Sequence, residues 1–144
     1  MLRSCTDARI DGFPTATAEG WLYGRHSGST YYAFGRTIVM GSSYLELRRV
    51  INGSITQLSS YLLGGSIERP AALTCEGTAI TGMWQSTNYG VTDSAIQSAG
   101  DWSAQLAMSE TAFECYDAPA PSGPAHRVIG SGIVNSLAIV RGAA

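Results

Sequence analysis

An Asn-Gly pair between two stretches of alternating residues constrains the fold of this chain more than any other feature. The pair is Asn52-Gly53, which follows residues 44–51 (YLELRRVI) and precedes residues 54–61 (SITQLSSY). A two-residue type I′ turn needs positive φ at both central positions, and Asn-Gly tolerates this best. The two stretches are therefore predicted to pair as an antiparallel hairpin.

Further strand patterns lie on both sides of this hairpin. Residues 31–40 are aromatic and β-branched, and Gly35 inside them indicates a bulge or a close backbone approach. A second hairpin is predicted from residues 71–76 and 79–85, which flank a Gly-Thr reversal. Shorter strands are expected at residues 103–108 and 136–141.

The segments between these strands carry turn signals rather than helical periodicity. Residues 86–90 and 130–132 are interpreted as turns, residues 118–123 as a Pro-rich loop, and residues 92–99 as one helical turn at most. About eight to ten short strands, with turn signals every 8–12 residues or so, predict an all-β antiparallel sandwich with little helix.

We expect a single domain. Residues 1–30 are interpreted as an N-terminal arm with the first strand, and residues 31–144 as the β-sandwich. No internal repeat of fixed period is visible, and no linker divides the chain.

The chain has few charges. Of its 144 residues 14% are charged, the net charge is −2, and every basic residue is arginine. Without a basic excess, nucleic acid is not an expected partner. No apolar run predicts a membrane span, and residues 1–12 lack the apolar core of a secretory signal. Because few charges protect exposed strand edges, we expect neighbouring subunits of a homo-oligomer to cover some of them.

The three cysteines, Cys5, Cys75 and Cys115, are too few and too widely spaced for a disulfide framework or a zinc site. Free thiols that behave as small hydrophobic residues are the first interpretation. One disulfide, between Cys75 and Cys115, is the alternative. No cofactor and no metal are expected.

The middle of the chain resembles concanavalin-like (laminin-G-like) jelly rolls. The resemblance rests on two hairpins, residues 44–60 and 73–84, on the segment VTDSAIQSAG at 91–100, and on the closing strand SLAIVR at 136–141. The resemblance covers roughly residues 31–141. Within the family, this segment is similar to domains of virion accessory proteins of tailed bacteriophages. In that family the last strand re-enters the sheet beside the first, so the resemblance implies the same here.

Signatures of catalysis are weak. Glycosidases place two carboxylates on one strand face, whereas Glu46 stands alone between leucines and is expected to pair with Arg48. His26 and His126 lie in stretches that look like loops, and no Gly-x-Ser-x-Gly elbow accompanies them. The sequence therefore predicts no enzyme.

Acidic residues also fail to form a convincing calcium loop. Asp93 and Asp101, near Asn88, are the only clustered candidates, and two carboxylates are too few. The competing interpretation is that Asp93 caps the following turn by accepting backbone N–H bonds.

Aromatic and amide side chains gather around the predicted turns between residues 84 and 102. Flat rings beside hydrogen-bonding groups suit a sugar or a protein partner, although such rings also fill cores and subunit interfaces. The candidate contact residues are Trp84, Asn88, Tyr89, Asp93 and Trp102. A second aromatic cluster comprises Trp21, Tyr23, Tyr31 and Tyr32.

These features lead to the expectation of a non-catalytic virion structural protein. It would decorate a capsid or serve as a tail accessory protein, made in the host cytoplasm and docked on the major capsid or tail protein. The alternative is a glycan-binding, lectin-like adhesion module that recognises a surface glycan.

Overall fold

A computed structural model describes residues 7–12, 20–63, 71–84, 87–106, 108–117, 128–136 and 139–141. These residues form twelve strands and no helix, so none of them forms a helix that could cross a membrane. The strands are β1 (Ala8–Gly12), β2 (Gly20–Ser27), β3 (Thr30–Val39), β4 (Ser42–Ile51), β5 (Ser54–Leu62), β6 (Ala71–Glu76), β7 (Ala79–Trp84), β8 (Thr87–Thr92), β9 (Asp101–Leu106), β10 (Met108–Asp117), β11 (Val128–Ser136) and β12 (Ile139–Arg141).

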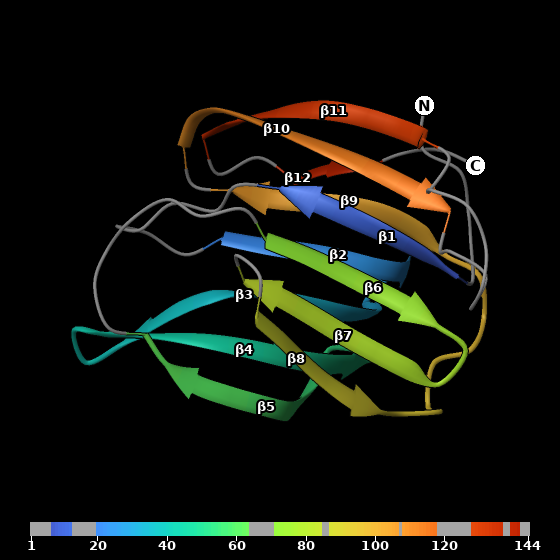
Figure 1. The fold of residues 1–144 in the computed structure, drawn as a ribbon, viewed down its shortest axis with the longest axis horizontal. Coiled ribbons are helices and arrows are strands. Elements are labelled where there is room, and N and C mark those ends of the chain that lie inside the picture. Colours follow the sequence, from blue (N-terminus) through green and yellow to red (C-terminus); the bar gives the residue numbers. More distant parts are fainter. Residues whose placement is uncertain are drawn as a thin grey trace.

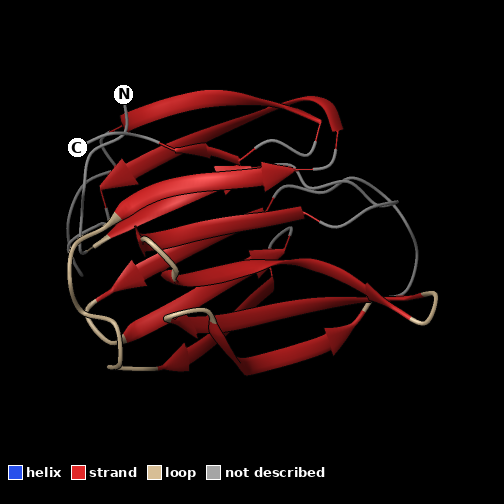
Figure 2. Cartoon of the chain, turned by 180° about the vertical axis from the view of Figure 1, so that it is seen from behind, coloured by secondary structure: helices blue, strands red, loops and turns tan. Residues whose placement is uncertain are grey.

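The strands form two six-stranded antiparallel sheets that pack face to face (Figures 1 and 2). One sheet, here the β1 sheet, has the order β11-β10-β1-β6-β7-β8, and the other, the β2 sheet, has the order β12-β9-β2-β3-β4-β5. The predicted all-β antiparallel sandwich is therefore confirmed. Two strands, β1 and β2, precede Tyr31 where the sequence indicated one, and each lies inside a sheet.

Both predicted hairpins form. Ile51 of β4 lies opposite Ser54 of β5, and Asn52 and Gly53 between them have φ values of 51° and 83°, as a type I′ turn requires. The second hairpin joins β6 to β7 around Gly77, whose φ is 57°.

Gly35 allows a close backbone approach and makes no bulge. A Cβ atom added there would lie 1.9 Å from the carbonyl oxygen of Gly20, and the register between β3 and β4 runs without a shift. A larger residue at this position would push β2 and β3 apart.

Two predicted turns are strands instead. Residues 86–90 fall largely in β8, where Tyr89 pairs with Gly82, and residues 130–132 lie inside β11. Asn and Gly are uncommon in strands, but pairing with β7 and β10 overrides that weak preference. The strand β10 was not anticipated, and residues 92–99 contain no helical turn. The Pro-rich segment 118–123 lies outside the described residues.

The closing strand also differs from its expected place. β12 pairs with β9, and neither β1 nor β2 is its neighbour. The reason lies in the pairing: β1 already lies between β10 and β6, and β2 between β9 and β3, so neither has a free side.

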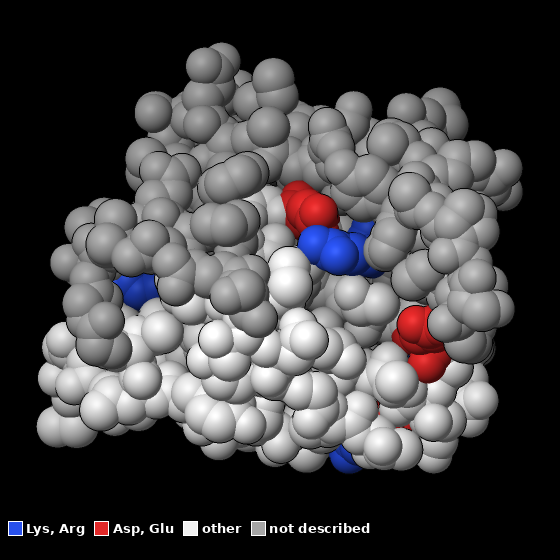
Figure 3. Space-filling view, viewed as in Figure 1, with Lys and Arg blue, Asp and Glu red and all other residues white. Residues whose placement is uncertain are grey.

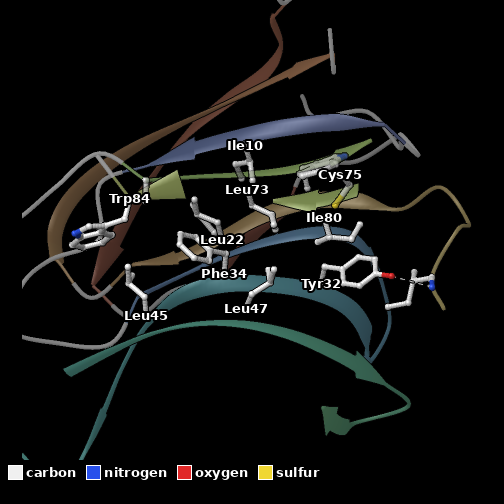
Figure 4. Packing of buried hydrophobic residues seen from close by; sticks show 14 residues of the cluster. Ile10, Leu22, Tyr32, Phe34, Leu45, Leu47, Leu73, Cys75, Ile80 and Trp84 are labelled. Atoms are coloured by element: carbon white, nitrogen blue, oxygen red, sulfur yellow. Dashed lines mark hydrogen bonds between the residues drawn. The ribbon is translucent and has the colours of Figure 1, made fainter. Parts of the chain in front are cut away.

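The core lies between the two sheets and follows the alternation of the strands (Figure 4). Leu45 and Leu47 of β4, for example, point inward and are fully buried, whereas Glu46 between them points to the outer face. The buried cluster consists of Ile10, Leu22, Tyr32, Phe34, Leu45, Leu47, Ala71, Leu73, Cys75, Ile80, Trp84, Ile96, Trp102 and Ala104.

Cys75 is a buried free thiol, and burial raises its pKa to about 12. The alternative disulfide with Cys115 is absent because β1 lies between the two residues: Ala8 of β1 lies opposite Cys75, and Ile10 of β1 lies opposite Cys115. Two positions separated by a whole strand are roughly 9.5 Å apart, beyond the reach of a disulfide. Cys5 lies outside the described residues.

Candidate interaction surface

The five candidate contact residues do not meet at one site. Trp102 has no exposed surface and Trp84 is 9% exposed, and both belong to the core cluster. Figure 4 shows Trp84 among the side chains that pack between the sheets. The core alternative therefore holds for the two tryptophans, and a ligand at the surface would not reach Trp102.

Asp93 caps the loop that follows it, as one interpretation of the sequence predicted. Its carboxylate accepts hydrogen bonds from the Tyr32 hydroxyl, from Arg49 and, at 3.0 Å, from the backbone N–H of Ala95. The Tyr32 hydroxyl in turn accepts the N–H of Ile96 at 3.3 Å, the bond drawn in Figure 4. This network fastens residues 93–100 across the end of the sandwich.

The network shifts the pKa values of its members in opposite directions. Burial alone would raise the pKa of Asp93, but the hydrogen bonds from Tyr32, Ala95 and Arg49 outweigh it and hold that pKa below its usual range. Burial, and then the bond to Asp93, raise the pKa of Tyr32. Asp93 is thus a structural carboxylate whose oxygens are already engaged.

Arg25 completes this end of the molecule with a buried charge. Its guanidinium donates to the carbonyl oxygens of Ile96 at 2.7 Å and Gly77 at 2.9 Å, and to the carboxylate of Asp7 at 3.1 Å. The side chain of Arg25 has no exposed surface. Arg25 therefore links the 93–100 loop to Asp7, which precedes β1, and to Gly77 in the turn between β6 and β7. We call this part, residues 93–100 with Arg25, Tyr32 and Arg49, the loop end.

A hollow of about 380 Å³ opens at the loop end. The residues that line it include the buried Arg25, uncharged polar residues such as Thr30, Asn52 and Gln97, and the apolar Ile51 and Ile96. None of the five candidate contact residues lines this hollow. Among the described residues, no group of three or more His, Cys, Asp or Glu side chains could hold a metal ion.

The outer face of the β2 sheet carries most of the second aromatic cluster. Trp21, Tyr23 and Tyr31 lie on this face, and the Arg48 guanidinium stacks 4.3 Å from the Trp21 ring centre. Tyr32, grouped with them by the sequence, lies in the core because neighbouring strand residues alternate between faces.

Arg48 also forms the expected ion pair with Glu46, at 2.7 Å. His26, expected in a loop, is instead a buried residue of β2, and its ring nitrogens lie 3.0 Å from the Ser103 hydroxyl and the Gly28 carbonyl. The sequence missed this because Ser103, 77 residues away, becomes a neighbour of His26 only when β9 pairs with β2. His126 lies outside the described residues.

The last two candidate residues, Asn88 and Tyr89, lie on β8 at one side of the sandwich. There β5 ends the β2 sheet and β8 ends the β1 sheet, and the rings of Tyr61 and Tyr89 pack together with centroids 4.3 Å apart. Asn88 is exposed and Tyr89 is half-buried. We call this side, formed by β5 and β8, the open edge; both strands lie at the bottom of Figure 1.

The open edge carries apolar side chains and no charge. Ile55, Tyr61 and Leu62 on β5 are 59%, 44% and 68% exposed, and neither β5 nor β8 contains a charged residue. In the view of Figure 3 the surface over β7 and β8 is almost entirely uncharged. An exposed, uncharged strand edge is a surface on which another chain can pair.

A second exposed apolar group lies at the turn between β3 and β4. Ile38 and Val39 are 37% and 51% exposed, and Met40 is fully exposed. This turn, residues 38–41, projects beyond the neighbouring strands at the end opposite the loop end, as both ribbon views show (Figures 1 and 2). We call it the hairpin tip.

Comparisons with known proteins assign no relative to this chain: no family model, no curated protein and no solved structure matches it.

Proposed function

We propose that this chain is a non-catalytic structural protein of a virion, which docks on the capsid or tail surface through its hairpin tip. The observation that carries the proposal is the complete exposure of Met40, with Ile38 and Val39 beside it. Moving an exposed Val or Met side chain into an apolar pocket contributes about 1.5–3 kcal/mol. A pocket on a neighbouring virion protein would supply that burial.

The composition of the tip is unusual for a turn. Met40 adopts a φ of 50°, in the left-handed region that Asn and Gly favour. The other long hairpin of the β2 sheet places Asn52 at the same φ, which is the favourable choice. A methionine at this position strains the turn and adds nothing to the core, so its apolar side chain is better explained by contact with a partner.

The virion context is supported by the resemblance to phage accessory domains, and the docking mode by the tip. The two hairpins on which that resemblance rests, β4–β5 and β6–β7, are both present and lie in opposite sheets. The two supports are separate, because an exposed apolar tip would serve attachment to any large assembly.

The test is the protein content of purified particles. The phage that encodes the chain is grown with wild-type protein or with Val39→Ser and Met40→Ser together, and particles are quantified by mass spectrometry. We expect the wild-type chain at a fixed ratio to the shell protein, and a loss of about tenfold or more for the tip variant. Gln97→Ala, an exposed change at the opposite end, is the control and should be incorporated normally.

Two results would contradict the proposal. One is the absence of the wild-type chain from particles. The other is incorporation of the folded tip variant at the wild-type ratio.

A glycan-binding function is the second candidate, and the hollow at the loop end favours it. Neutral hydroxyl and amide groups beside apolar surface suit a sugar, and Gln97 and Ser98 line that hollow. Screening on a glycan array tests it: binding that Gln97→Ala and Ser98→Ala together abolish would support this function, and no binding by the wild type would remove it.

A further inference from the structure

We propose that two copies of this chain pair through β5 at the open edge, in one defined register. The strand is the last of the β2 sheet, so among the described residues it has a neighbour, β4, on one side only. On its other side the backbone N–H and C=O groups are oriented for a further strand. Nine residues of β5 extend over about 30 Å.

The chemistry of β5 favours a copy of itself as the occupant. Proteins usually protect edge strands with charges or proline, and the sequence SITQLSSYL contains neither. A charged edge would repel its own copy or select an oppositely charged partner. A neutral edge with apolar side chains at both ends does not repel its own copy and does not select a charged partner. Two such edges can pair with each other through their apolar ends.

A bulge at Leu58 decides which side chains of β5 share a face. Arg48 of β4 lies opposite Gln57, but the preceding Leu47 lies opposite Ser59, so Leu58 is an extra residue in the register. Leu58 packs against the core. In a regular strand two residues seven positions apart would lie on opposite faces. The bulge puts both Ile55 and Leu62 on the outer face instead.

The pairing with β4 establishes this placement. Ile55 lies opposite Val50 and lines the same outer hollow as Trp21 and Arg48. Leu62 lies opposite Tyr44, which lines an outer hollow with Glu46 and Gln57. The two most exposed apolar residues of the strand thus lie on one face, at its two ends.

If a two-fold axis relates the two copies, one register places residues of the same face opposite each other along the whole strand. Opposite residues in an antiparallel pair must lie on the same face of the sheet. Ile55 of one copy therefore lies opposite Leu62 of the second copy, and Thr56 opposite Tyr61 of the second copy. A register centred on Leu58 would instead oppose Gln57, on the outer face, to Ser59, on the inner face.

This register covers part of the exposed apolar surface of the edge. Each copy places Ile55 against Leu62 of the other, so both ends of the new strand pair become apolar contacts. The same axis brings β8 against β8 of the second copy, because Tyr61 and Tyr89 join the two edge strands within each copy. Both sheets then contribute to the interface.

The experiment introduces charged residues at the two ends of β5 and measures dimerisation by sedimentation velocity. The wild type should sediment as a dimer. Ile55→Lys with Leu62→Lys puts like charges opposite each other at both ends and should weaken the dimer about 100-fold or more. Ile55→Lys with Leu62→Glu carries the same number of charges but makes them complementary, and should restore the dimer to within about tenfold of the wild type.

Thr78→Lys in the turn between β6 and β7 is the matched control, since it adds a charge at an exposed residue outside the open edge and should leave the dimer intact. Circular dichroism confirms that each variant is folded. A monomeric wild type would overturn the proposal, and so would a double-lysine variant that remains dimeric. If the complementary variant is as monomeric as the double-lysine variant, the register is wrong. None of these results bears on particle docking, which the tip variants test.

Discussion

The loop end and the open edge differ in how far their side chains are buried and hydrogen-bonded within the chain. At the loop end, Asp93, Tyr32 and Arg25 are buried, and each is hydrogen-bonded to partners far along the chain. At the open edge, Ile55 and Leu62 are more than half exposed, and β5 and β8 contain no charge. The polar groups of the loop end are thus satisfied within one chain, whereas we propose that a second chain completes the open edge.

Because of this difference, we expect substitutions of similar size to affect stability in one region and association in another. A substitution in the core or at the loop end should reduce the free energy of unfolding. A substitution at the open edge should change association and leave the folded monomer almost unaffected.

The largest expected effect is that of Trp102→Ala in the core. Removing a fully buried tryptophan should lower the free energy of unfolding by about 3–5 kcal/mol, measured by denaturant titration. The control is Asn88→Ala, an exposed change on β8 that should stay within about 0.5 kcal/mol. A Trp102→Ala protein of normal stability that had lost binding to a ligand would instead place this residue at a binding surface.

The next effect is that of Asp93→Asn at the loop end. The amide keeps the size of the side chain but loses the charge that accepts bonds from Arg49 and Tyr32, so stability should fall by about 2 kcal/mol. Arg49→Gln removes one of these donors and should have a smaller effect, because the bonds from Tyr32 and Ala95 remain. Equal losses in both variants would mean that the ion pair alone fastens the loop.

The pH dependence of stability sharpens the same point. The pKa of Asp93 is lower in the folded chain than its usual value near 3.9, so the carboxylate stabilises the fold above that value. This contribution is lost as the pH falls through the folded pKa. Below about pH 4 the thermal midpoint of the wild type should therefore fall more steeply than that of Asp93→Asn, and parallel curves would contradict the network.

The smallest effect on the monomer is that of Leu62→Ser at the open edge. Because 68% of this side chain is exposed, the free energy of unfolding at high dilution should change by less than about 0.5 kcal/mol. The same protein should dimerise more weakly than the wild type in sedimentation. A loss of more than about 1 kcal/mol in the dilute protein would show that Leu62 supports the monomer itself.

Local signals in the sequence predicted the hairpins well. Asn52-Gly53 defines its turn because positive φ is a property of two adjacent residues, and no distant contact is needed. Strand β8 was missed for the converse reason: Asn88 and Gly90 look like turn residues until pairing with β7 makes them a strand.

The candidate site was harder to predict because its residues depend on distant partners. The sequence grouped Trp84, Tyr89 and Trp102 by their nearness along the chain, but the structure buries the two tryptophans and leaves Tyr89 at the edge. No local pattern distinguishes Arg25, since its partners Gly77 and Ile96 lie 52 and 71 residues away. The exposed tip at Met40 could have been suspected from an apolar run that ends in a Gly-Ser-Ser turn.

The most direct test of the account is amide hydrogen exchange of β5 as a function of protein concentration. If the open edge is completed by a second copy, the amides of Ser54–Leu62 that face away from β4 exchange rapidly in dilute protein and become protected as the concentration rises. The amides of the loop end should be equally protected throughout. Exchange in β5 that is independent of concentration would contradict the central claim that this edge is an interface.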